Sequence, residues 1–289
     1  MGVPLSTTLS VEKQPPKASA VKVDITRTTP LYPRSVYIQW VVVNPDKGTD
    51  YLFNIWRSGS SEGPWEQVLL DSPDFFYADT DFPANYEDRK PGLMTLNDTI
   101  YYKVEAKVGG VVVGEEVQLV QAALDRRRRG IHRKLVRDAE VYLRKVMGTQ
   151  VAILKRKQWG EVCPHCVSST GMSVRAHCGY CHGTGILHGY WNPVYGYSQR
   201  SATPIERMTS SEGTVEIHRL TAIMWHVPKV EPKDVLVFLR DDKRYIIEAV
   251  SPTSIHGVTV HQECSVSELA RSSSEWNIKV DPWHDPKWF

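Results

Sequence analysis

The length, composition and charge of this chain exclude several broad classes of protein. Its 289 residues are 41% hydrophobic, so the chain can bury more than one core, and we expect two or three modules. Five cysteines are too few for a disulfide-dense secreted scaffold. No apolar run approaches the roughly 18 to 20 residues of a membrane span, and the N-terminus lacks a basic start followed by an apolar block. We therefore expect a soluble, unexported protein.

The net charge of +2 conceals an uneven distribution along the chain. Residues 1–120 carry 11 Lys and Arg against 16 Asp and Glu, residues 121–160 carry 12 against 3, and residues 161–289 carry 12 against 14. The three segments therefore have net charges of −5, +9 and −2. A positive field confined to one segment suits contact with phosphate or with an acidic protein surface.

The first 120 residues predict an arm followed by a β-sandwich. Residues 1–20 are rich in Ser, Thr, Lys and Pro, which predicts a flexible N-terminal arm. Over residues 21–120, short runs of alternating apolar and polar residues are separated by turn-forming segments such as NPDKGTD, and this pattern predicts an antiparallel sandwich. The residues that we expect in its core are Val36, Ile38, Trp40, Tyr102, Val104 and Ala106.

This stretch resembles a fibronectin type III domain. The resemblance is carried by Trp40 at the second-strand position and by YLFNIWRSGSSEGPWEQV as a third strand, turn and fourth strand. It is also carried by YYKVEA near the sixth strand, where Tyr102 would form the tyrosine corner of that family. The resemblance implies a binding or spacer module and argues against catalysis in this third of the chain.

After Val120 the apolar period becomes helical. The spacing predicts a helix over residues 122–147, weakened at Gly130, within a basic connecting segment 121–150. The residues expected to form its apolar stripe are Leu124, Ile131, Leu135, Ala139, Tyr142 and Val146. The first half of the helix holds many cations, although the helix dipole disfavours positive charge there. These cations form a solvated face, contact an acidic partner surface or bind phosphate; as candidate interface residues we take Arg126, Arg127, Arg128, Arg129, Arg133 and Lys134.

Two CxxC motifs, 11 residues apart, give the strongest signal in the chain. They are Cys163 with Cys166 and Cys178 with Cys181. Two such knuckles supply the four thiolates of a tetrahedral zinc site. Because thiolates alone fill the coordination sphere, whereas catalytic zinc keeps a position open for water, we expect one structural zinc per chain. A disulfide or redox pair and a catalytic metal are the alternatives.

Several residues around the knuckles have expected supporting roles. Gly179 should allow the turn inside the second knuckle, and Gly183 and Gly185 should let the backbone fold close to the sulfurs. The segment CGYCHGTG resembles one CxxCxGxG unit of the DnaJ-type cysteine-rich domain, which carries four such units, so a two-ion site is not implied. We expect Cys264 to be a small buried residue. The nearby histidines could replace a cysteine but are expected beside the ligands or facing solvent; they are His165, His177, His182 and His188.

The aromatic residues that follow the knuckles have two interpretations. Tyr190 and Trp191 lie in LHGYWNPVYGYSQR, at the end of the expected zinc-binding loop 151–200. They are either part of a packed loop that covers the knuckles or anchors of an interface. The same choice applies to the C-terminal tail 281–289, where Trp283, Trp288 and Phe289 would dock on a neighbouring subunit or on the parent chain.

The remaining sequence predicts a second all-β unit. VAILKRKQWG should be a strand that enters the cysteine segment, and residues 198–213 should be a loop. Short strands follow, with DDK as a tight hairpin and with Pro252 and Gly257 marking turns. We therefore expect a small β-barrel over residues 201–280, with the zinc-stapled loop as an insertion. The fold class is mainly β.

The C-terminal unit resembles the small β-barrel of head-closure, stopper and tail-completion proteins from the neck of tailed bacteriophages. In that family a P-x-D entry, a hairpin strand, a V-x-Q strand and a short helical stretch recur. The corresponding residues here are Pro232, Asp234, Arg244–Val250, Val260, Gln262 and Val266–Ala270. The resemblance implies a virion protein, made in the host cytoplasm, that forms a homo-oligomeric ring beside portal, adaptor or tail components. Contact with packaged DNA would not depend on sequence, and no membrane is implied.

Two further interpretations remain open at this stage. One is a collar or baseplate component of the same kind of particle, and the other is a zinc-stapled nucleic-acid-binding protein. An enzyme is not expected, because the sequence contains no glycine-rich phosphate loop before a helix, no HExxH and no GxSxG. The opposite charges of neighbouring segments suit contacts between subunits.

Overall fold

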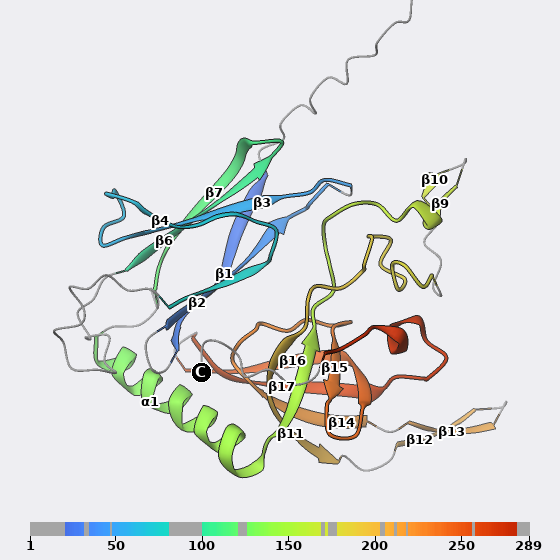
Figure 1. Ribbon diagram of the computed structural model, residues 1–289. Helices are drawn as coiled ribbons and strands as arrows, with labels where there is room; N and C mark the ends of the chain where they lie inside the picture. Colours follow the sequence, from blue (N-terminus) through green and yellow to red (C-terminus); the bar gives the residue numbers. More distant parts are fainter. Residues whose placement is uncertain are drawn as a thin grey trace, which may run out of the picture.

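The computed structural model combines a β-sandwich, one long helix, a closed barrel and a cysteine-rich insertion (Figure 1). It describes residues 21–31, 35–46, 48–80, 100–120, 126–168, 171–172, 178–202, 206–210, 213–217, 219–255 and 258–281. The expected arm 1–20 and the tail residues Trp283, Trp288 and Phe289 lie outside the described residues. No helix in the described part of the chain is long and apolar enough to cross a membrane.

The sandwich has two antiparallel sheets with the strand orders β1-β2-β5 and β4-β3-β6-β7. This is the arrangement of a fibronectin type III-like sandwich, so the expected fold is confirmed. The first sheet consists of β1 (Lys22–Leu31), β2 (Ser35–Val43) and β5 (Phe76–Asp79). The second consists of β3 (Leu52–Ser58), β4 (Glu66–Ser72), β6 (Tyr101–Val108) and β7 (Val111–Leu119).

The core of the sandwich is the expected one. The predicted core residues are fully buried, namely Val36, Ile38, Trp40, Tyr102, Val104 and Ala106. The opposite face of β2 is buried as well, because Tyr37 packs in a second cluster with Val136 of the helix and Trp225 of the barrel. β2 therefore contributes to two cores. One of its faces packs inside the sandwich, and the other packs against the helix and the barrel.

Tyr102 lies in the sixth strand, as the family resemblance implies, but its hydroxyl has a different partner. A tyrosine corner donates to the backbone. Here the Tyr102 hydroxyl donates to Oδ2 of Asp79 at 2.6 Å, and Nη1 of Arg57 donates to the same oxygen at 2.7 Å. Burial raises the pKa of Tyr102 well above its usual value, so the hydroxyl remains a donor. A buried carboxylate therefore fixes this tyrosine.

The helix α1 covers Arg126–Tyr142 and continues as a π-helical turn, η2, over Leu143–Met147. Most of the expected apolar stripe is exposed: Ile131 is 49% exposed, Val146 is 67% exposed, and Leu135 and Tyr142 are also exposed. Of its described members, Ala139 is partly buried and packs against the cluster of Tyr37 and Val136. The residues buried instead are His132, Val136, Glu140 and Leu143. Two of these are polar, so hydrophobic periodicity could not find this face. Gly130 lies inside the continuous helix, and Leu124 is outside the described residues.

The second all-β unit is a closed six-stranded barrel with the order β11-β14-β17-β16-β15-β8, so the predicted small barrel is confirmed. It begins well before the expected residue 201, because β8 and β11 belong to it. Its strands are β8 (Thr149–Leu154), β11 (Val194–Ala202), β14 (Arg219–Trp225), β15 (Val235–Phe238), β16 (Lys243–Ile255) and β17 (Val258–Glu268). β8 pairs directly with β11, with Ile153 opposite Val194. Residues 155–193 are therefore an insertion between two neighbouring strands of the barrel.

Two local expectations for this unit are wrong. The described residues of the expected loop 198–213 are strand residues, because β11 extends to Ala202 and β12 (Glu206–Ser210) pairs with β13 (Gly213–Ile217). Polar side chains do not prevent strand pairing, because the hydrogen bonds between paired strands are made by backbone groups. Pro252 marks no turn but lies in β16 opposite Gln262, beyond the part of β16 that pairs with β15. Gly257 is outside the described residues.

The expected short helical stretch at Val266–Ala270 is likewise absent from that position. β17 runs to Glu268, and the one-turn 3-10 helix η4 follows at Ser274–Asn277. Val266 is fully buried in the barrel because it faces its core as a strand residue.

An aromatic junction connects the sandwich to the barrel. The ring of Trp159 lies 5.9 Å from that of Phe53 in β3 and 5.3 Å from that of Trp191, and Trp191 lies 5.7 Å from Phe75. Both tryptophans come from the insertion, whereas both phenylalanines come from the sandwich. A single hydrophobic cluster consequently runs from one unit into the other.

Two glutamine side chains make hydrogen bonds to the backbone of the segment that follows β14. Gln39 of the sandwich accepts from the backbone N–H of Lys229 at 2.8 Å and donates to its carbonyl at 3.2 Å. Gln262 of β17 accepts from the N–H of Val230 at 3.1 Å and donates to the carbonyls of Trp225 and Pro228 at 2.9 and 2.8 Å. Gln262, a residue of the V-x-Q motif, thus positions the barrel segment that the sandwich contacts.

His226 lies fully buried in the same segment. Neither of its ring nitrogens has a hydrogen-bond partner. Burial, the neighbouring His132 of α1 and Arg27 of β1 all lower its pKa, to well below the usual value. Burial also lowers the pKa of His132, whose Nε2 lies 3.2 Å from the carbonyl oxygen of Thr259. Both histidines are therefore neutral in the folded protein at neutral pH.

These histidines predict a loss of stability in mild acid. The folded pKa is depressed, so the unfolded chain binds more protons below the unfolded pKa of about 6.5. The contribution of each histidine to the free energy of unfolding should be constant above that pH and fall below it, by up to about 1.4 kcal/mol per pH unit. Burial raises the pKa of Glu140 to about 7, so this carboxyl has the opposite dependence and offsets part of the loss. We expect His226→Phe to reduce this slope, as measured by urea unfolding between pH 7 and pH 5.

A matched control for this experiment is His261→Phe in β17, because His261 lies outside the cluster and is partly exposed. It should keep the wild-type slope. An identical pH dependence in the wild type and in His226→Phe would contradict the assignment.

Candidate metal centre

The base of the insertion is fixed to the barrel by a buried ion pair. Nζ of Lys155 donates to Oδ2 of Asp234 at 2.8 Å, and the backbone N–H groups of Arg156 and Glu231 donate to the same carboxylate, each at 2.8 Å. Lys155 and Asp234 are both buried. Burial raises the pKa of Asp234 even though Lys155 and these donors lower it. Asp234 of the P-x-D motif therefore fixes the point at which the chain leaves the barrel.

The two arms of the insertion pair with each other from this base toward the cysteines. The N–H of Trp191 donates to the carbonyl of Lys155, and that of Lys157 donates to Gly189, both at 2.9 Å. Further out, Leu187 donates to Glu161 at 2.8 Å, and Cys163 donates to the carbonyl of Gly185 at 2.9 Å. The two cysteine motifs are thus brought together by backbone pairing.

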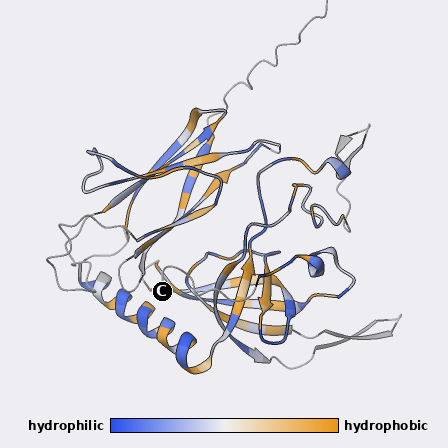
Figure 2. Ribbon diagram, viewed as in Figure 1, coloured by the Kyte–Doolittle hydropathy of each residue, from blue (hydrophilic) through white to orange (hydrophobic). Residues whose placement is uncertain are grey.

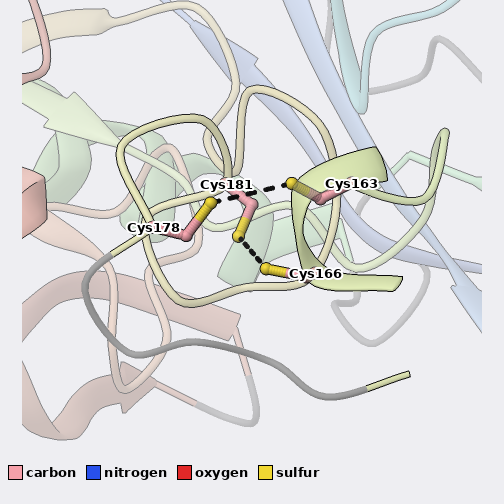
Figure 3. A group of neighbouring side chains, drawn as sticks. All are labelled: Cys163, Cys166, Cys178 and Cys181. Carbon is pink, nitrogen blue, oxygen red and sulfur yellow. Dashed lines mark hydrogen bonds between the residues drawn. The ribbon is translucent and has the colours of Figure 1, made fainter. Parts of the chain in front are cut away.

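The four cysteine side chains converge on one point (Figure 3). All four are buried, and their Sγ atoms lie within 4.8 Å of one another. The Sγ of Cys163 lies 3.8 Å from that of Cys178, and the Sγ of Cys166 lies 3.5 Å from that of Cys181. A disulfide would require about 2.0 Å. Tetrahedral zinc, with Zn–S bonds of about 2.3 Å, places its sulfurs about 3.8 Å apart, so the donor set fits such an ion.

Backbone N–H groups around the cluster favour thiolates. The N–H groups of Cys181 and Tyr180 lower the pKa of Cys178 to about 6. Burial raises the pKa of Cys181 to about 12, against the opposing effect of N–H groups from Gly185 and Gly183. Cys178 is therefore more easily ionised than Cys181, and the positive charge of a bound ion would favour the thiolate form of both.

The expected roles of the glycines in the second knuckle are confirmed at two positions and wrong at one. Gly183 and Gly185 adopt φ angles of 73° and 81°, which confirms that the backbone needs them. Gly179 does not have a positive φ, and a Cβ there would meet nothing within 4 Å, so its expected role in the turn is wrong. The sequence interpretation overlooked Gly189, where a Cβ would collide with the carbonyl oxygen of Cys181. Only that tertiary contact identifies Gly189.

The described histidines near the cluster lie outside the group of sulfur ligands. The ring of His165 stacks on Tyr180 with centroids 3.9 Å apart, and Nδ1 of His182 lies 2.9 Å from the carbonyl oxygen of Ser274. His188 is exposed, and His177 is outside the described residues. Cys264 is buried in β17, with Met224 as its sulfur neighbour, which confirms its expected role as a small core residue.

The candidate interface residues divide between the interior and the surface. Tyr190 is buried, with its hydroxyl 3.4 Å from the carbonyl of Lys233, and Trp191 packs in the junction under Nζ of Lys157. These two side chains thus pack within the chain. Arg127, Arg128 and Lys134 are exposed on α1, and Arg133 is half-buried. Arg126 and Arg129 belong to the helix, but their side chains are outside the described set. α1 lies across the molecule from the cysteines (Figure 1).

Comparison with known proteins adds little to this geometry. No protein-family model matches the chain, and no curated protein is significantly similar to it. Among solved structures, an Fn3-like protein from Clostridium thermocellum is similar, with 22% identity, over 31% of this chain and 86% of that one, at a TM-score of 0.21.

The Lys155–Asp234 pair predicts a large cost when one partner is neutralised. Asp234→Asn leaves the buried Lys155 ammonium with only the more exposed Glu231, 3.3 Å away, as its counter-ion, so the free energy of unfolding should fall by about 3 kcal/mol. Chemical denaturation measures this change. The control is Arg200→Met, which removes an exposed ion pair with Asp241 of 2.7 Å and should cost about 1 kcal/mol or less. Equal costs for the two variants would show that Lys155 is not held as a buried charge.

Proposed function

We propose that the four cysteines bind one zinc ion whose role is structural. The proposal is supported by four buried sulfurs at the spacing of a tetrahedral site. With four thiolates as ligands, no coordination position is left for a reacting water. The segment between the knuckles cannot build a hydrophobic core of its own, and metal coordination replaces such a core with a free energy on the order of 10 kcal/mol.

For the whole chain, we propose a non-enzymatic structural protein of a tailed-phage virion, in particular a ring-forming component of the neck. The observation that carries this proposal is the small closed barrel with a sandwich appended to it through a buried junction. Such a subunit is rigid enough to hold a fixed position in a ring. Asp234 and Gln262, which carry the resemblance to neck proteins, each hold backbone groups of the barrel.

Within the same proposal, the partners are copies of the chain together with portal, adaptor or tail components. The subunits would form a closed ring, in which a rotation relates each subunit to the next through the same heterologous contact. A collar or baseplate position uses the same architecture. Basic side chains that face a lumen would contact packaged DNA through phosphate, without sequence preference.

A nucleic-acid-binding protein is the second candidate. It is favoured by the exposed cations Arg127, Arg128 and Lys134 on one helix, because such a cluster attracts phosphate. The exposed apolar residues on the same helix favour a protein partner instead, since phosphate offers them no contact.

The zinc proposal predicts metal content and a local loss of structure on its removal. Elemental analysis should give about one zinc per chain. We expect Cys178→Ser to lose the metal and to increase proteolysis in the insertion, while Cys264→Ala retains the metal. Full zinc content in Cys178→Ser, or no zinc in the wild type, would contradict the assignment.

The assembly proposal predicts an oligomer of many subunits. Sedimentation analysis of the full chain should show a ring-sized species that persists in moderate salt. A monomer that binds duplex DNA with a steep dependence on salt concentration would favour the second candidate instead.

A further inference from the structure

The exposed side of α1 and η2 carries apolar side chains that nothing in the described chain covers. Figure 2 shows apolar residues interspersed among hydrophilic ones along this helix. We define these exposed residues as the helix surface; they are Ile131, Leu135, Val141, Tyr142, Val146 and Met147. Single exposed apolar residues are ordinary on a monomer, but six on one short helical segment form a patch of the kind that marks a contact site.

A second exposed apolar patch lies at one end of the sandwich. Val111, which is 66% exposed, and Val112 follow the turn between β6 and β7. Leu52 is exposed in the neighbouring strand, opposite Lys107, and Val43 is exposed at the end of β2. We define Val43, Leu52, Val111 and Val112 as the hairpin surface.

The two surfaces carry opposite charge. The exposed charged residues around the helix surface are Arg127, Arg128, Lys134, Arg137 and Lys145, with Asp138 as the exposed acid. Those around the hairpin surface are Asp24, Asp46, Asp50 and Glu115, with Lys22 as the exposed base. The partly buried Lys107, which lies between Leu52 and Val112, is ion-paired with Asp71. Each surface therefore offers apolar contact area, and their charges are complementary.

The two surfaces cannot meet within one chain. The β6–β7 turn lies at one end of the molecule and α1 lies at the other, with the rest of the sandwich between them (Figure 1). Complementary patches at opposite ends of a rigid subunit generate head-to-tail contacts, which close into a ring or continue as a filament.

We propose that the helix surface of one copy docks on the hairpin surface of the next copy. This inference rests on the proposed assembly of the chain with itself and names the contact that forms it. Phosphate or a lipid headgroup would neutralise the helix cations, but neither explains a matching acidic and apolar patch at the far end. A second copy of the chain satisfies both surfaces.

Two double variants and their mixture test this contact. Ile131→Asp with Leu135→Asp removes the helix surface, and Val111→Asp with Val112→Asp removes the hairpin surface. All four side chains are exposed, so the fold should survive. Each variant alone should be monomeric in sedimentation, with self-association weakened about tenfold or more. Their mixture should form a 1:1 dimer, because each variant retains the surface that the other lacks.

Leu70→Asp is the matched control, because Leu70 is 57% exposed on β4 and belongs to neither surface. It should assemble like the wild type. If the wild type assembles and either double variant forms the same oligomer, this contact is wrong while the assembly proposal stands. A mixture that stays monomeric would indicate a symmetric contact and also overturn the inference.

Two further outcomes identify a different occupant or a different function. If the helix variant still assembles but no longer binds duplex DNA or vesicles of anionic lipid, the helix surface serves phosphate and the inference fails. A wild type that is monomeric at every concentration overturns the assembly proposal together with this contact.

Discussion

The burial of Trp159 and Trp191 between the two β units is the contact on which the arrangement of the molecule depends. Neither residue belongs to the sandwich or to a barrel strand; both come from the insertion between β8 and β11. One inserted segment therefore supplies the packing that joins the units. Large aromatic side chains suit this role, because each removes a wide apolar area from water on both sides of the junction.

The cysteine cluster acts on the same segment from its other end. The arms that carry the two tryptophans are paired by backbone hydrogen bonds from Lys155 out to Cys163, and the sulfurs lie where this pairing ends. A bound ion would close the loop at its tip as the Lys155–Asp234 pair closes it at its base. On the zinc proposal, the metal stabilises the junction without touching it, because it restricts the arms that present the tryptophans.

The side of α1 that packs against the barrel contains polar residues. His132 and Glu140 are buried on the side of the helix that faces the barrel, whereas Ile131 and Leu135 face outward. Burial raises the pKa of Glu140 to about 7, against the opposing charge of Arg144. A helix that buries ionisable groups and exposes apolar ones loses stability as a monomer, and a partner on the outer side would compensate for part of that loss. The orientation of the helix thus connects the fold to the proposed contact between copies.

The sequence by itself determined the features that have a local cause. Alternation placed Val36, Ile38 and Trp40 in a core, and CxxC spacing identified the four sulfurs, because a strand period and a chelating turn are both properties of neighbouring residues. Only the tertiary structure decided which face of α1 is buried, where Trp191 packs and why Gly189 must lack a side chain. The first two depend on residues far away in the chain, whose approach is set by the closure of the barrel. The third depends on how the insertion folds back on Cys181. No pattern of adjacent residues encodes those distances.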